Sequence, residues 1–287
     1  MNKNLKIACL IILFILVIIV LLFFSVKGKD DNSNKTIVAV SIVPEVEFVK
    51  AVSGDEFDIV TMIPSGASPE NYEPTPMEKG KFEKASIYFS IGVPTEENNI
   101  LPSISENTKL VKLDEDVKRK YADLTFENGA RDPHIWLSPQ RVIIMVQKIA
   151  DELSELKPEN KEKYQENASK YIEKLENVIL EIDSILTQKE NKKFIVYHPA
   201  FAYLADEFGM EMYALEEEGK EATVESLKEK IDLAKKENIK YIFYQAEIDS
   251  SQSKAFAEEI GGQTMMLEPL AENYIENLKK MAELLSN

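Results

Sequence analysis

Short apolar runs alternate with amphipathic stretches from residue 36 onward. The run "TIVAVSIVP" (36–44) predicts a buried strand, and the following "EVEFVKAVSG" predicts a helix that ends at Gly54. Further strands are predicted at "DIVTMIP", "SIYFSIG" and "KLVKL". Thr75, Pro76 and Glu78 form a capping box with proline at the first helical position, so a helix should begin there.

The second half of the chain repeats this order of elements. "KKFIVYHP" (192–199) predicts a strand that stops at a proline, and "AFAYLADEFG" predicts a helix that ends at Gly209. Strands are also expected at "MEMYAL", "YIFYQA" and "TMMLEP", with helices between them. Because alternating strands and helices are typical of parallel sheets covered by helices, we predict two related α/β lobes.

A long amphipathic segment, residues 158–190, separates the two halves. Apolar residues recur at steps of three and four, and there is no glycine and no internal proline. At about 1.5 Å per residue, this segment predicts one rigid helix more than about 40 Å long. We therefore expect an N-terminal lobe over residues 36–157, a linking helix over 158–190 and a C-terminal lobe over 191–287.

The N-terminus begins with an uncharged apolar run, residues 7–26, which is about long enough to span a bilayer. Lys3 and Lys6 precede it, which predicts a cytoplasmic N-terminus and an extracytoplasmic remainder. A cleaved signal peptide is the alternative, although its apolar region would be shorter and no small-residue cleavage site ends this run clearly. We favour an uncleaved transmembrane anchor at residues 1–29, followed by a polar tether at 30–35.

The composition narrows the class of protein. The formal net charge is −16, and the only charges before Asp30 are four lysines, so the remainder is more acidic still. This acidity argues against binding to nucleic acid or lying on an anionic membrane surface, and is compatible with attracting cations. Cys9 is the only cysteine, which suits an extracytoplasmic protein that is stabilised by its core rather than by disulfides.

The chain has two histidines, His134 in "DPHIWL" and His198 in "VYHPAF". With Glu70 and Glu268 they form a set of side chains that we expect at strand ends beside prolines, where ligands bind in open α/β sheets. Two imidazoles and two carboxylates suit Zn²⁺ or Mn²⁺, disfavour Cu(I), and balance a divalent charge. The alternative is that these four are unrelated polar loop residues.

Several motifs together resemble the zinc/manganese family of metal-binding receptors of ABC importers, which includes the ZnuA and TroA proteins. The similar pieces are "SIVP", "PSGASPENYEPTP", "DPHIWLSP", "VYHPAFAYLADEFG", "EEEGKEAT" and "LEPL", and they span nearly all of residues 36–287. The resemblance implies two α/β lobes joined by a long helix, with one metal ion between them. His134 and His198 match the family's ligand positions directly.

Two of the implied ligands depart from the family pattern. Glu70 stands where the family form "PHxYEPTP" has histidine, and Glu268 stands where "LDPL" has aspartate. Both replacements keep an oxygen donor. Glu247 in "YQAEID" is the rival to Glu268 as the fourth ligand. The stretch before "DPH" also lacks the histidine-rich loop of many zinc-binding members, which removes one argument for zinc without favouring manganese.

Together with the N-terminal apolar run, the resemblance predicts a membrane-anchored, extracytoplasmic, monomeric receptor that delivers zinc or manganese to an ABC permease and catalyses no reaction. A metal-dependent hydrolase is the first alternative, but it needs an open coordination position, which four protein ligands would not leave on a tetrahedral ion. A surface adhesin of the same fold is the second alternative.

Overall fold

The computed structural model describes residues 35–216, 223–247 and 251–287. The predicted anchor, residues 1–29, lies outside this described part of the chain. Within the described part, no helix is both long enough and apolar enough to cross a membrane. Residues 36–287 form one compact unit.

The first lobe is built on a sheet of four parallel strands in the order β2-β1-β3-β4. The strands are β1 (Ile37–Val40), β2 (Asp58–Thr61), β3 (Ile87–Ser90) and β4 (Lys109–Lys112). In the central strand, Val38 is opposite Ile59 of β2 and Ile87 of β3. β1 and β3 are almost entirely buried, as their continuous apolar runs predict for strands covered on both faces.

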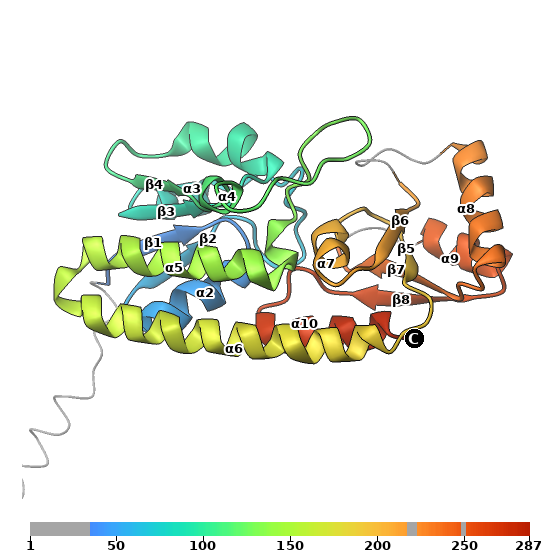
Figure 1. The fold of residues 1–287 in the computed structure, drawn as a ribbon. Helices are drawn as coiled ribbons and strands as arrows, with labels where there is room; N and C mark the ends of the chain where they lie inside the picture. The colour runs from blue at the N-terminus through green and yellow to red at the C-terminus, as the bar shows by residue number, and fades with distance from the viewer. Residues whose placement is uncertain (1–34, 217–222, 248–250) are drawn as a thin grey trace, which may run out of the picture. The chain divides into compact units, whose positions relative to one another are not determined.

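The second lobe repeats this topology with the strand order β6-β5-β7-β8, again all parallel. The strands are β5 (Lys193–Val196), β6 (Glu211–Ala214), β7 (Tyr241–Gln245) and β8 (Gln263–Leu267). The two sheets lie side by side in Figure 1. The prediction of two related α/β lobes with parallel sheets is therefore confirmed.

The helices of the first lobe are α2 (Val43–Ser53), α3 (Pro76–Phe82), α4 (Leu113–Lys118) and α5 (Pro139–Leu156). The predicted capping box starts α3: Thr75 Oγ1 accepts a hydrogen bond from Glu78 N at 3.3 Å, and Glu78 Oε2 accepts one from Thr75 N at 2.7 Å. α2 ends where predicted, because Gly54 turns the chain with a φ of +66° that glycine adopts without strain.

The helices of the second lobe are α7 (Ala202–Glu207), α8 (Val224–Lys236), α9 (Ser251–Glu259) and α10 (Tyr274–Leu285). A small hydrophobic cluster beneath α8 and α9 is separate from the main core and includes Ile195, Ile242 and Phe256. The main core continues through both lobes.

The predicted long helix is α6 (Lys161–Thr187), which has 27 residues and follows a short 3₁₀ turn at Pro158–Asn160. It packs against α2 and α5 of the first lobe and against α10 of the second. Figure 1 shows it running beneath both sheets. Because both lobes share this helix and one apolar core, α6 joins them as a strut rather than as a flexible linker.

Hydrogen bonds also tie the two lobes together directly. Trp136 Nε1 donates to the carbonyl of Pro269 at 2.9 Å, and the Tyr274 hydroxyl donates to the carbonyl of Trp136 at 2.6 Å. The hydroxyl of Tyr203 donates to the carbonyl of Asp132 at 3.0 Å. These bonds fix the segment that carries His134 against the second lobe.

Candidate metal centre

The structure brings three of the four predicted ligands together. Donor atoms of Glu70, His134 and His198 all lie within 4.8 Å of one another. Nε2 of His198 is 2.8 Å from Oε1 of Glu70, and the two imidazole rings meet edge to face with centroids 5.3 Å apart. Two side chains of the first lobe therefore converge with one of the second.

Local structure places each of these side chains differently. His198 lies two residues beyond the end of β5, as a ligand at the carboxyl end of a parallel strand should. Glu70 lies in the loop between β2 and α3, nine residues beyond the end of β2, so the prediction that it stands at a strand end was wrong. The prediction that His134 ends a strand was wrong, because it directly precedes the 3₁₀ turn Ile135–Leu137 that leads into α5. The ring of His134 is buried, and so are the three residues of the turn that follows it.

The loop that carries Glu70 is held at several points. Thr95 N donates to the carbonyl of Pro69 at 3.1 Å, and Asn99 Nδ2 donates to the carbonyl of Tyr72 at 2.8 Å. The Tyr72 hydroxyl donates to Glu78 in α3 at 2.9 Å. These contacts fix the backbone of the proline-rich loop from which Glu70 extends.

Both histidines are oriented by a carboxylate on the far side of the ring. Nδ1 of His134 is 2.7 Å from Oδ1 of Asp132, which also accepts the His134 backbone N–H at 2.9 Å. Nδ1 of His198 donates to Oε1 of Glu216. When Nδ1 is the donor, Nε2 carries the lone pair that a metal ion needs, so these two acids set the useful tautomer.

The sequence analysis did not identify Asp132 or Glu216. Asp132 could have been found from its position in the sequence, because a carboxylate two residues before His134 can reach the imidazole ring. The signal for Glu216 lies in strand pairing. Val196 of β5 is opposite Ala214 of β6, and the same register two residues further places His198 opposite Glu216.

His198 and Glu70 form an ion pair at the centre of the site. Burial alone would lower the pKa of His198, but the hydrogen bonds and charges of Glu216 and Glu70 outweigh it and raise the pKa to about 9. Burial would raise the pKa of Glu70, but the hydrogen bond from His198 and the charges of both histidines lower it. An imidazolium therefore donates to a carboxylate where a metal ion would bind both.

These side chains surround a cavity of about 10 Å³, which is roughly the space that one water molecule occupies. The lining residues are Ser68, Pro69, Glu70, His134, Trp136, His198, Gln245, Glu247, Pro269 and Leu270. This volume is of the size that a single ion occupies.

Glu268 follows β8 directly, as predicted, but the structure does not bring it into the three-residue cluster. Its Oε2 is 2.7 Å from Nζ of Lys280 in α10. Glu247 lines the cavity instead. Burial raises the pKa of the Glu247 carboxyl, and the nearby charge of Glu268 adds to the effect. The identity of the fourth ligand stays a prediction.

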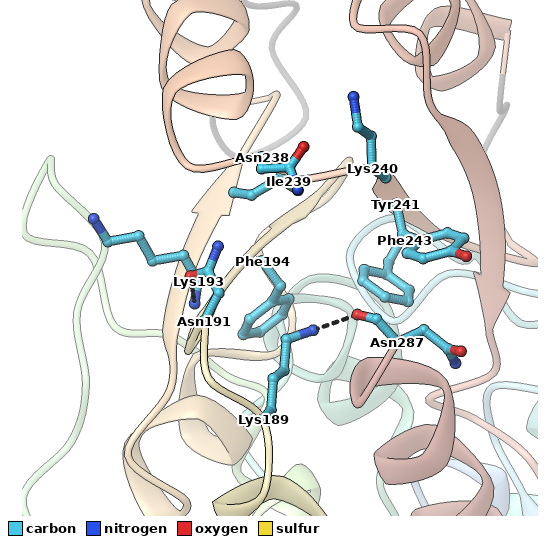
Figure 2. A pocket seen from close by; sticks show the side chains of 10 residues that line it. All are labelled: Lys189, Asn191, Lys193, Phe194, Asn238, Ile239, Lys240, Tyr241, Phe243 and Asn287. Carbon is cyan, nitrogen blue, oxygen red and sulfur yellow. Dashed lines mark hydrogen bonds between the residues drawn. The ribbon is translucent and has the colours of Figure 1, made fainter.

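A larger cavity of about 260 Å³ lies at the amino ends of β5 and β7. The described residues that line it include no carboxylate or imidazole side chain. Lys189 donates to a backbone oxygen of Asn287 at 2.8 Å, while Lys193 and Lys240 extend away from the cavity (Figure 2). This cavity therefore lacks the donors of a cation site and lies at the opposite strand ends from His198.

Known proteins resemble this chain over most of its length. It is 29% identical to the "High-affinity zinc uptake system protein ZnuA" of Bacillus subtilis over 89% of this chain and 84% of the relative. It is 28% identical to the "Zinc-binding protein AdcA" of Streptococcus pyogenes over 82% of this chain, but spans only 50% of that relative. A crystal structure of ZnuA superposes with a TM-score of 0.82 at 33% identity, covering 88% of this chain and 99% of the other.

The family model "Zinc-uptake complex component A periplasmic" (ZnuA) matches residues 38–287. This match includes both sheets, the long helix and every residue of the candidate metal centre. The chain therefore belongs to the ZnuA family of zinc-uptake components.

Proposed function

We propose that this chain captures a divalent transition-metal ion outside the cytoplasm and delivers it to the permease of an ABC importer. The observation that carries the proposal is the convergence of Glu70, His134 and His198 around a cavity of about 10 Å³. A cavity of this size admits an ion only without its hydration shell. Because the ligands come from both lobes, a partner protein that displaces either lobe would release the ion.

We further propose Zn²⁺ as the physiological ion, with Mn²⁺ as the alternative. Two imidazole nitrogens and carboxylate oxygens are donors of the kind that a tetrahedral Zn²⁺ site accepts readily. Mn²⁺ favours oxygen donors and a higher coordination number, which a cavity of this size supports less well. The family and its named relatives also favour zinc.

The site is better suited to transport than to catalysis. A hydrolytic metal centre needs a coordination position that is open to water and a space for the substrate beside it. The cavity has room for roughly one water-sized particle, and apolar residues such as Trp136 and Leu270 form part of its wall. We therefore propose that the protein catalyses no reaction.

The remaining parts of the proposal concern the membrane. We propose that residues 1–29 anchor the protein, that residues 30–35 serve as a tether, and that the chain acts as a monomer beside its permease. We also propose that residues 36–157 and 191–287 form the two lobes and that residues 158–190 form the helix that links them. Mass spectrometry of the N-terminus from native membranes would test the anchor, because a cleaved chain would lack residues 1–29.

The function is tested by metal analysis and titration. Full-length protein, purified in mild detergent and stripped with EDTA, should bind one Zn²⁺ per chain in a competition titration with a fluorescent chelator. Deletion of the gene should reduce zinc accumulation at low external zinc. A chain that binds neither Zn²⁺ nor Mn²⁺ would contradict the proposal.

A further inference from the structure

The segment that carries His134 is held from both lobes. On the side of the first lobe, Nη1 of Arg131 donates a hydrogen bond to the carbonyl of Gly92, just beyond β3, at 3.0 Å. On the side of the second lobe, the hydroxyl of Tyr203 in α7 donates to the carbonyl of Asp132 at 3.0 Å. A residue of the second lobe therefore binds the residue that orients a ligand of the first.

The hydroxyl of Tyr203 is used as both donor and acceptor. It accepts a hydrogen bond from the backbone N–H of Leu124 at 3.0 Å while it donates to Asp132. Asp132 N donates to the carbonyl of Leu124 at 2.9 Å, so Asp132 is held through both its N–H and its carbonyl. Tyr203 is fully buried, and burial raises the pKa of its hydroxyl to about 12, so it stays protonated near neutral pH.

The position of the Asp132 backbone decides how His134 is presented. Oδ1 of Asp132 accepts hydrogen bonds from the backbone N–H and from Nδ1 of His134, at 2.9 and 2.7 Å. Hydrogen bonds weaken steeply as their geometry departs from the ideal. A small displacement of Asp132 therefore loosens the bond to Nδ1 and permits the other tautomer of His134, in which Nε2 carries the proton and has no lone pair for a metal ion.

The ring of Tyr203 is fixed by contacts that do not involve its hydroxyl. The guanidinium of Arg141, in α5 of the first lobe, lies 4.6 Å from the ring centroid and pairs with Asp206 of α7 at 3.4 Å. Glu207 of α7 accepts a hydrogen bond from Gln140 N at 3.3 Å. A phenylalanine at position 203 keeps these contacts and loses only the bonds of the hydroxyl.

We propose that Tyr203 is a positioning residue through which the second lobe controls the affinity of the metal site. The inference rests on the proposed function, since it concerns capture and release of the same ion. α7 begins four residues after His198, so a displacement of the second lobe moves His198 and Tyr203 together. This movement withdraws one imidazole ligand and, through Asp132, ends the orientation of the other.

The test compares Tyr203→Phe with Tyr164→Phe in the full-length protein. Tyr164 is the matched control because it is also buried, and its hydroxyl contacts Asn160 and Glu56 near the amino end of β2. Zn²⁺ affinity, measured by chelator competition, should fall about tenfold for Tyr203→Phe and change less than about threefold for Tyr164→Phe. The visible absorption of bound Co²⁺, which reports its coordination geometry, should change only in Tyr203→Phe.

Two further measurements separate positioning from a purely structural role. The chain has two histidines, so ¹⁵N NMR of the imidazole rings in EDTA reads the tautomer of each, and His198→Gln assigns the signals. The form of His134 with the proton on Nδ1 should predominate in the wild type and lose its predominance in Tyr203→Phe. In an Asp132→Asn background, Tyr203→Phe should cost no more than about twofold in affinity, because both residues act on His134 in series.

Three results would overturn the inference. Unchanged Zn²⁺ affinity in Tyr203→Phe, with only a lower midpoint of unfolding in EDTA, would make the hydroxyl purely structural. A loss that is equally large in the Asp132→Asn background would show that the effect does not pass through Asp132. An unchanged His134 tautomer would do the same. Wild-type protein that binds no Zn²⁺ would refute the proposed function as well, so the two failures are distinguishable.

Discussion

Nε2 of His198 lies 2.8 Å from Oε1 of Glu70, so a side chain of the second lobe meets one of the first across the metal cavity. Glu216 accepts a hydrogen bond from the other ring nitrogen. In this arrangement a proton on Nε2 occupies the position that a metal ion would take. Metal binding and proton binding therefore compete for the same two side chains.

The first prediction concerns pH. Without metal, the pKa of His198 is raised to about 9, and a ligating imidazole must be neutral, so below this value binding has to expel a proton. Affinity for Zn²⁺ should therefore increase with pH up to about 9, by as much as tenfold per pH unit, and then level off. Chelator competition at pH 7, 8 and 9 measures this.

Calorimetry in buffers of different ionisation enthalpy gives an independent count of the released protons. About one proton per ion is expected from His198 near pH 7. An affinity that does not change between pH 7 and 9, with no proton release, would show that His198 is neutral before the metal arrives.

The second prediction is that the ion stabilises the fold. A ligand that binds only the native state adds about 4 kcal/mol at a thousandfold excess over its Kd. For a domain of this size, that corresponds to an increase in Tm of roughly 10 °C. Thermal unfolding with EDTA, Zn²⁺ or Mn²⁺ should show it, and Mg²⁺ serves as the control. Identical midpoints in all four conditions would contradict a site that spans both lobes.

The third prediction concerns Glu70. Replacing Glu70 by Gln preserves the shape of the side chain but removes the charge that balances the cation, so affinity should fall by more than about tenfold, or 1.4 kcal/mol. Glu70→His introduces a softer donor and should shift preference from Mn²⁺ toward Zn²⁺. Glu73→Gln, an exposed position on the same loop, is the control. Parental binding of both metals by Glu70→Gln would exclude Glu70 as a ligand.

The fourth prediction concerns Asp132, which contacts His134 rather than the cavity. Asp132→Asn weakens the bond to Nδ1 and permits the wrong tautomer, so Zn²⁺ affinity should fall about 10- to 100-fold. Asp55→Asn, at an exposed position, should leave affinity unchanged. If Asp132→Asn instead lowers only the stability of the metal-free protein, the carboxylate has a purely structural role.

The fifth prediction concerns the direct link between the lobes. Trp136→Phe removes the indole donor and leaves the carbonyl of Pro269 without it, which should cost about 1–3 kcal/mol of unfolding free energy. Urea unfolding in EDTA measures this independently of the metal. A change below about 0.5 kcal/mol would mean that the bond between the lobes contributes little to stability.

The sequence predicted most of the fold because each element has its own local signal. Apolar runs predicted the strands, and Thr75 and Gly54 predicted a helix start and a helix end. Apolar residues that recur at steps of three and four predicted α6. The site was harder to predict. Glu216 is positioned by the pairing of β5 with β6, and a single sequence does not specify that register. The direction of the Glu268 side chain depends on Lys280, twelve residues later on α10.

The size of the cavity at Glu70, His134 and His198 has a consequence for which ions can enter. A space for one water-sized particle cannot accept a hydrated cation, so the ion must lose its hydration shell on the way in. Mg²⁺ gives up its water reluctantly, and Ca²⁺ requires six to eight oxygen ligands. Zn²⁺ is satisfied by four nitrogen and oxygen donors of the kind that this site offers. The small cavity therefore requires an ion that exchanges its hydration shell for a few protein donors, and it is the chemistry of those donors that favours Zn²⁺ over Mg²⁺ and Ca²⁺.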